Sequence, residues 1–198
     1  MVGPLINAFL GKTSQIELAI ASYALALSMT QLVLSFFTYI HQIVLSFYND
    51  HPKKVKAFTL LIGIIPTSIL ALFCYTPLGP FFIETILGAN VRLAEATLQS
   101  LRIFMIMTAV FPFIDFINGI LLLRSQTKMM VVSQTANLAI TFVVLLIAST
   151  LAPGWNGMIG ALAQSLGMAG ELVVLISIVL KSSYPKRALS HNSNKQVG

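Results

Sequence analysis

The sequence predicts an all-α, polytopic membrane helix bundle with five full transmembrane helices and an N-terminal stub. Hydrophobic residues make up 57% of the 198 residues and charged residues 9%, whereas a soluble domain typically carries about a quarter charged residues. The mean hydropathy is +0.87, and five apolar stretches are each long enough to cross a hydrocarbon core of about 30 Å as a helix. We therefore expect residues 1–180 to form one transmembrane half-bundle and residues 181–198 a polar, basic, disordered cytoplasmic tail.

The first apolar run, Val2 to Leu10, is too short to span a membrane, and we expect it to be the end of a helix whose beginning is absent. The first full crossing lies within Ile16 to Tyr48. Its polar residues recur at spacings of three and four, which places them on one face of an α-helix: Ser28, Gln31, Ser35, Thr38, Gln42, Ser46 and Asn49. Such a face either bonds a neighbouring helix or lines a cavity, and the two glutamines favour the cavity. His41 lies beside this face, where an interfacial or hydrogen-bonded role is more common than proton transfer.

The second crossing is predicted from Val55 to Tyr75, with a bend at Pro66. Lys53, Lys54 and Lys56 lie at its start. The following apolar run, Phe81 to Leu87, is too short to span, so we expect it to lie along the membrane interface. Gly88 ends that run.

The third crossing carries a carboxylate in the middle of an apolar segment. The span between Arg102 and Arg124 is about one bilayer thickness, and Asp115 lies near its centre. An aspartate at that depth costs about 2.5 to 3.5 kcal/mol, so such residues usually face a bundle interior or a wet cavity. Pro112, one turn upstream, removes a backbone hydrogen bond and is expected to kink the helix.

Two roles remain open for Asp115. Its protonation could be coupled to a change of access between the two sides of the membrane, or it could stay protonated and bond a neighbouring helix. Asn118 is three residues further on and shares its face, and we expect Asn118 and Gln31 to be its hydrogen-bonding neighbours. Gly119 is expected to let another helix come close.

The fourth crossing is predicted from Lys128 to Leu151 and the fifth from Gly157 to Leu180. The fourth carries Gln134, Asn137 and Thr141 on one face. The fifth carries a close-packing stripe interrupted by polar groups at Gln164 and Glu171: its members are Gly157, Gly160, Gln164, Gly167 and Glu171. The candidate substrate or ion pathway is the set of polar residues within the crossings, namely Asp115, Asn118, Gln31, Gln42, Glu171, Gln164, Gln134 and Asn137.

The positive charges predict an orientation. With five crossings, nine of the 12 Lys and Arg residues fall on the side that holds the C-terminus. Because cytoplasmic loops are enriched in Lys and Arg, we expect the C-terminus to be cytoplasmic and the protein to lie in the cell membrane. The cations flank apolar spans and form no basic stripe interleaved with aromatic residues, so nucleic-acid binding is not expected.

The sequence contains no motif of a known active site. It has no GxSxG or HExxH motif, no glycine-rich phosphate loop and no cluster of Cys and His ligands, so we expect no catalytic residue, metal or cofactor. Asp115 and Glu171 could form an acid/base pair, but a nucleophile or metal motif to accompany them is missing. Cys74 is the single cysteine, so a disulfide framework is excluded.

Four short segments resemble the first half of the progressive ankylosis protein family. They are Ala21-Ser22-Tyr23-Ala24-Leu25-Ala26-Leu27-Ser28, Tyr75-Thr76-Pro77-Leu78-Gly79, Phe111-Pro112-Phe113-Ile114-Asp115 and Gly119-Ile120-Leu121-Leu122. The resemblance extends over most of residues 3–180 in the same order and spacing. It places the chain in the superfamily of multidrug (MATE), oligosaccharidyl-lipid and polysaccharide flippases, whose members have two lobes of six helices around a central cavity. It also implies an exporter of a small anion such as pyrophosphate, nucleotide or citrate.

Set against that family, we expect the chain to lack a second lobe and most of the first helix. No cation lies in the middle of a crossing, so this half alone is a poor anion site. Three hypotheses follow. The chain is a transporter lobe that works as a homodimer or beside a second half-transporter chain; it is a MATE-like lobe for a cationic drug or lipid-linked sugar; or it is a truncated or structural membrane fragment without transport of its own.

Overall fold

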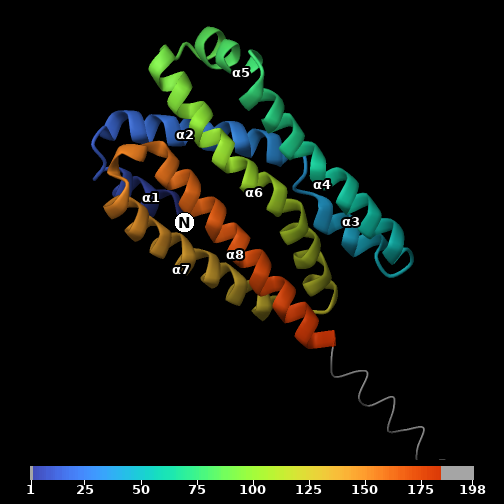
Figure 1. Cartoon of the computed structure of the whole chain (residues 1–198). Coiled ribbons are helices and arrows are strands. Elements are labelled where there is room, and N and C mark those ends of the chain that lie inside the picture. The colour runs from blue at the N-terminus through green and yellow to red at the C-terminus, as the bar shows by residue number, and fades with distance from the viewer. Residues whose placement is uncertain (1, 184–198) are drawn as a thin grey trace, which may run out of the picture.

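The computed structural model describes residues 2–183, which form helices joined by short turns (Figure 1). The helices are α1 (Val2–Leu10), α2 (Ile16–Ser35), α3 (Ile40–Phe47), α4 (Pro52–Tyr75), α5 (Leu78–Phe81), α6 (Val91–Leu123), α7 (Thr127–Leu151) and α8 (Gly157–Ser183). A π-helical turn, Phe82–Ile86, follows α5, and a 3-10 turn, Pro153–Trp155, precedes α8. No strand occurs within residues 2–183, so the predicted all-α class is confirmed.

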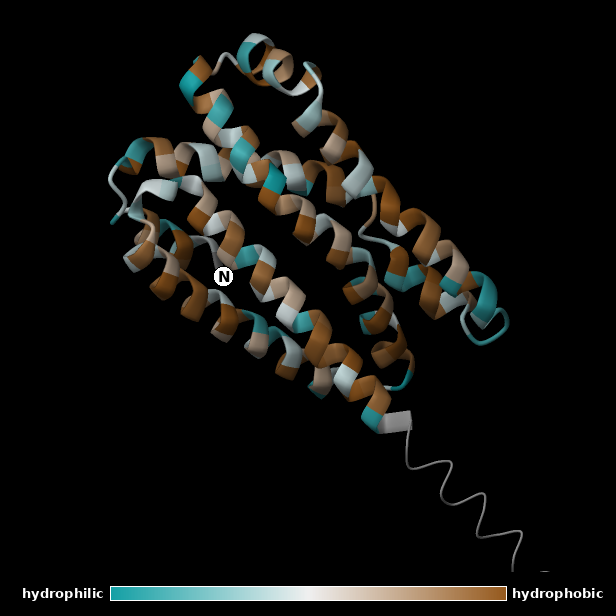
Figure 2. Cartoon of the chain, viewed as in Figure 1, coloured by the Kyte–Doolittle hydropathy of each residue, from teal (hydrophilic) through white to brown (hydrophobic). Residues whose placement is uncertain are grey.

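Five segments are long and apolar enough to cross a membrane, as predicted: Ile16–Phe47, Pro52–Tyr75, Val91–Leu123, Thr127–Leu151 and Gly157–Lys181. Figure 2 shows hydrophobic residues along the lengths of these helices and many of the hydrophilic residues near their ends. Because hydrocarbon offers no hydrogen bonds, helices that satisfy their own backbone groups are the form such segments take. The short apolar run before Gly88 forms α5 and the π-helical turn, neither of which is long enough to span.

The first span is two helices and not the single helix that the polar periodicity predicted. The chain leaves α-helical geometry after Ser35, passes through turns at residues 36–39 and resumes at Ile40 as α3. Local side-chain bonds stabilise the break, because the Ser35 hydroxyl donates to the Leu32 carbonyl at 2.7 Å and the Thr38 hydroxyl to the Ser35 carbonyl at 2.8 Å. The polar face is therefore divided, and Gln42 belongs to a different helix from Gln31.

The 33-residue helix α6 is the central element. It packs against α2, α3, α4 and α8, and it runs without interruption through Pro112. The Asn90 side chain caps its first turn by accepting a hydrogen bond from the Leu93 N–H at 2.8 Å. Gly63 of α4 lies opposite Pro112, and a Cβ added at Gly63 would be 3.4 Å from the Pro112 Cβ, an ordinary contact for a helix pair.

The glycine stripe of α8 packs closely against its neighbours, as predicted. Gly160 faces the ring of Tyr23 on α2, and Gly167 faces Asn137 and Thr141 on α7. The stub α1 packs on α7 and α8, where its Ile6 side chain is fully buried in the main hydrophobic core. Small residues at these positions let helix backbones approach closely, which is how helices associate in lipid.

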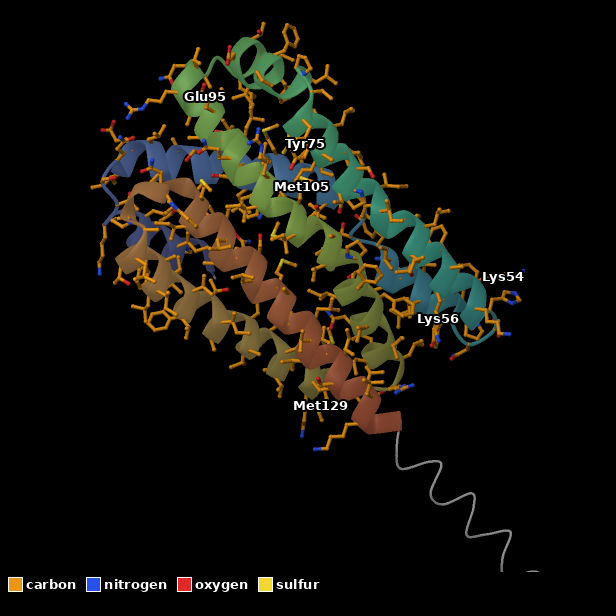
Figure 3. All side chains as sticks on the ribbon, in the orientation of Figure 1. Lys54, Lys56, Tyr75, Glu95, Met105 and Met129 are labelled. Atoms are coloured by element: carbon orange, nitrogen blue, oxygen red, sulfur yellow. The ribbon has the colours of Figure 1, made fainter. Side chains whose placement is uncertain are left out.

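The two ends of the bundle differ in their charged residues. Figure 3 shows Lys54 and Lys56 at the end where α3 meets α4, and Tyr75 and Glu95 toward the opposite end. Helix α8 continues to Ser183, three residues beyond the predicted boundary at Leu180. The remainder of the predicted tail, residues 184–198, lies outside the described residues.

Candidate functional site

The carboxylate of Asp115 contacts the start of α3. Its Oδ2 accepts a hydrogen bond from the backbone N–H of His41 at 2.8 Å, and its Oδ1 lies 3.0 Å from the His41 Nδ1. The side chains are partly accessible, with 15% of Asp115 and 31% of His41 exposed. Asp115 on α6 and His41 on α3 thus form a polar pair between the third and first spans, and Nδ1–H is the ring group positioned to donate to the carboxylate.

The pair follows from the break in the first span. A helix leaves its first backbone N–H groups without internal partners, and the residue before α3, Tyr39, provides no side-chain cap. Asp115 supplies the acceptor from another helix, and its negative charge is favoured at the positive end of the helix dipole. The carboxylate therefore satisfies an N–H group that the break leaves free within an apolar span.

Gly119 brings α3 near enough for this contact. A Cβ added at Gly119 would lie 2.8 Å from the Val44 Cβ and 3.1 Å from the His41 Cα. Both distances are shorter than an ordinary carbon contact of about 3.5 to 4.0 Å. Gly119 lies one helical turn after Asp115, so the close approach of the backbones and the carboxylate contact occur on the same face of α6.

A cavity of about 320 Å³ begins about one helical turn from the Asp115–His41 pair, and neither member of the pair lines it. Its polar lining comes from the end of α2, the break and α8, and its apolar lining includes two methionines; the lining residues are Gln31, Leu34, Ser35, Thr38, Met107, Phe111, Gln164 and Met168. Phe111 is one turn before Asp115, and Thr38 is three residues before His41. The volume falls within the range of small-molecule sites, roughly 300 to 1,000 Å³.

A second polar cluster lies between α7 and α8. Glu171 is 5% exposed, and its Oε2 accepts a hydrogen bond from the Asn137 Nδ2 at 2.7 Å. The Asn137 Oδ1 accepts from the Thr141 hydroxyl at 3.2 Å. Gly167 on α8 makes room for both α7 side chains. This cluster satisfies the polar groups of two packed spans by interhelical hydrogen bonds, the arrangement typical of membrane helix pairs.

The structure separates the candidate pathway residues into groups. Gln31 and Gln164 meet at the cavity, and Asn137 meets Glu171. The expected bonds from Gln31 and Asn118 to Asp115 are not formed, and the carboxylate is instead bonded by His41.

Three candidate pathway residues belong to none of these groups. The Asn118 Oδ1 is buried and accepts no hydrogen bond from residues 2–183. Gln42 and Gln134 are exposed on α3 and α7, and neither borders the cavity. These three positions therefore lie outside the groups that the fold assembles.

Two residues of this region were not selected by the sequence pattern. For His41 the sequence favours an interfacial or hydrogen-bonded role over proton transfer, and Tyr23 stands out only within a segment that resembles the family. Tyr23 donates a hydrogen bond to the Gln164 Oε1 at 2.7 Å. The length of the first span, 32 residues, does not mark a break near His41, because the 33-residue α6 runs unbroken. Within residues 2–183 no group of three or more His, Cys, Asp or Glu side chains is placed to hold a metal ion.

Comparison with known proteins gives one family. The model of the family described as progressive ankylosis protein (ANKH) matches residues 8–187. No curated protein and no solved structure matches the chain.

Proposed function

From the premise that the chain belongs to the progressive ankylosis protein family, whose members are multi-pass membrane proteins of the transporter type, we propose that it is one lobe of a proton-coupled exporter of a small anion. The anion is a phosphate or carboxylate compound such as pyrophosphate, nucleotide or citrate. The Asp115–His41 pair is the coupling site, and the adjoining cavity is this lobe's part of the substrate path.

The observation that carries the proposal is the broken first span whose second half is held by Asp115. Discontinuous helices whose ends face a site near mid-membrane are a recurring feature of secondary transporters. Here the start of α3 bonds the carboxylate at 2.8 Å, next to a cavity of about 320 Å³. Adding a proton to Asp115 removes the charge that the α3 dipole favours, so the contact between α3 and α6 weakens.

The groups around Asp115 allow a proton to change the contact. His41 is the titratable side chain that faces it, and within the described residues α2, α4 and α8 place no charged side chain in hydrogen-bond contact with it. A proton on either partner alters the attraction across the same two helices. Alternating protonation on the two sides of the membrane would then be linked to the movement of α3 relative to α6.

The active form requires a second lobe, either a second copy of this chain or a second half-transporter chain. The cavity is bordered by Gln31 and Ser35, both exposed, and polar groups at this depth are not left facing lipid. A second lobe across the cavity would enclose them, as in transporters built from repeated halves. The proposal puts the protein in the cell membrane with its C-terminus in the cytoplasm, and the support is that nine of the 12 Lys and Arg residues fall on the side of the C-terminus.

The test is export from vesicles that contain the purified protein, with labelled pyrophosphate, citrate and a cationic dye as probes and an imposed pH gradient. Wild type should move an anion and lose that transport when the gradient is collapsed. Asp115→Asn keeps the shape but cannot titrate, so it should insert and fold yet lose the dependence on the gradient. Glu95→Gln, a carboxylate neutralised on the same helix away from the pair, is the matched control and should behave as wild type.

The other outcomes separate the alternatives. An Asp115→Asn variant with an unchanged pH dependence would make Asp115 a structural residue and overturn the coupling role. Export of the dye in place of the anions would identify a MATE-like drug or lipid-linked sugar lobe. Export of no probe by the wild type would leave a membrane fragment without transport of its own.

A further inference from the structure

The ring of Tyr23 is fixed between three helices. Tyr23 is 2% exposed. One side lies against Gly160 of α8, where an added Cβ would be 2.7 Å from the Tyr23 Cδ2. The Phe104 ring of α6 lies 6.0 Å away between centroids. Because neither neighbour leaves room for the ring to move, the position of the Tyr23 hydroxyl is set by the packing of α2, α6 and α8.

The hydroxyl determines which way the Gln164 amide points. Gln164 is one turn after Gly160, and its Oε1 accepts the Tyr23 hydrogen bond at 2.7 Å. A carboxamide whose oxygen is engaged on one side presents its NH₂ on the other. Gln164 lines the cavity, and no acceptor within residues 2–183 takes its Nε2–H groups. These donors are therefore available to a molecule in the cavity.

The other hydroxyl groups of the lining are already donating. Ser35 and Thr38 give their protons to backbone carbonyls at the break. Gln31, which has no hydrogen-bond partner among the described residues, adds a second amide. The remaining lining residues are apolar, and none of the lining residues carries a formal charge. Free N–H donors of this cavity thus come from two glutamine amides.

The geometry points to Tyr23 as a positioning residue that sets the polarity of the cavity: by holding the Gln164 oxygen, it turns the amide N–H groups toward the substrate. This inference rests on the proposed function and specifies it further. The half-site formed by Gln31 and Gln164 takes the oxygen atoms of a phosphate or carboxylate group as hydrogen-bond acceptors. It disfavours an ammonium group, since an amide N–H cannot accept from it.

Two variants test this orientation with little change of shape. Tyr23→Phe removes only the hydroxyl, so the Gln164 amide is free to rotate. Gln164→Glu replaces the NH₂ group by an oxygen and removes the donors altogether. Tyr48→Phe is the matched control, because Tyr48 packs edge-on against Phe116 at 5.9 Å, away from the cavity lining.

The measurements are vesicle transport of labelled pyrophosphate and citrate, and binding of the same two anions by the detergent-solubilised protein in isothermal titration calorimetry. Tyr23→Phe should raise both KM and Kd about threefold to tenfold with kcat unchanged, since the amide must be ordered on binding. Gln164→Glu should raise them by more than tenfold, because an acceptor then faces an anion. Tyr48→Phe should match wild type.

Failure of this inference and failure of the proposed function give different results. Transport by wild type with unchanged KM and Kd in Tyr23→Phe and Gln164→Glu would overturn the role of Tyr23 and keep the function. Anion binding that weakens in both variants without any transport by wild type would keep the half-site and overturn the exporter. A wild type that neither binds nor transports either anion would overturn both.

Discussion

Replacing Gly119 by alanine should separate α3 from α6 without changing any polar group. The new Cβ would lie 2.8 Å from the Val44 Cβ, and a normal carbon contact needs about 3.5 to 4.0 Å, so α3 must move away by about 1 Å. The His41 N–H bond to Asp115 is now 2.8 Å. The same movement would lengthen it to about 3.8 Å, beyond the hydrogen-bond limit of about 3.2 Å. Overpacking of this kind typically costs about 1 to 3 kcal/mol.

Gly119→Ala should therefore reproduce the transport defect of Asp115→Asn although the carboxylate is intact. The assay is the pH dependence of export from vesicles, together with thermal unfolding in detergent to show that the variant remains folded. Gly63→Ala is the control. Gly63 is on α4 and faces Pro112 of α6, and the new Cβ would lie at an ordinary contact distance of 3.4 Å from the Pro112 Cβ. A Gly119→Ala protein with wild-type pH dependence and stability would refute the argument that close approach at Gly119 maintains the pair.

Three further outcomes are expected. Cysteine-substituted variants should react with an impermeant reagent from outside at Trp155 and from inside at Lys54, and inside labelling at 155 would reverse the orientation inferred from the charges. The protein should not be monomeric in mild detergent, as judged by light scattering, and a monodisperse monomer that transports would contradict the need for a second lobe. Glu171→Gln should insert and should transport with the wild-type pH dependence, because the hydrogen bond from Asn137 serves to join two helices. Glu171→Leu should lower the unfolding temperature, because it leaves the Asn137 amide without its acceptor.

The five spans could be predicted from the sequence because hydrophobic length alone determines them. The apolar runs and the charged or glycine-rich turns between them gave boundaries close to those observed, for example Lys128 to Leu151 against Thr127–Leu151. The close-packing role of α8 could also be predicted. Glycines at spacings of three and four form one face of a helix whatever its neighbours are, and here Gly160 and Gly167 lie against α2 and α7.

The break in the first span could not be read from its own residues. Residues 36–39 are Phe, Phe, Thr and Tyr, without the glycine or proline that usually marks a sharp change in a helix. The polar spacing even continues through them as though the helix were whole. Two residues of α6 stabilise the break. Asp115 accepts a hydrogen bond from the first turn of α3, and the lack of a side chain at Gly119 lets α3 approach closely. A pattern within one segment carries no information about an acceptor that lies 74 residues further along the chain.

The same limit explains why the sequence did not identify which residues of the site contact one another. Periodicity identifies a face, so it places Gln31, Gln164 and Asp115 each on the polar face of its own helix. It does not say which faces meet. His41 contacts Asp115 where α3 begins after the break, and Tyr23 contacts Gln164 where Gly160 leaves space for its ring. Each pairing depends on contacts between distant segments, which a single sequence does not specify.

The Asp115 carboxylate and the broken first span each offset the cost of the other. Alone, a mid-membrane aspartate costs about 2.5 to 3.5 kcal/mol, and an unpaired backbone N–H in hydrocarbon costs several kcal/mol as well. Together they form a bond of 2.8 Å at the favourable end of α3. The carboxylate cannot leave this position unless another acceptor replaces it at the free N–H. We expect water or a substrate oxygen from the cavity to be that acceptor, which would link release of α3 by a proton on Asp115 to occupation of the cavity.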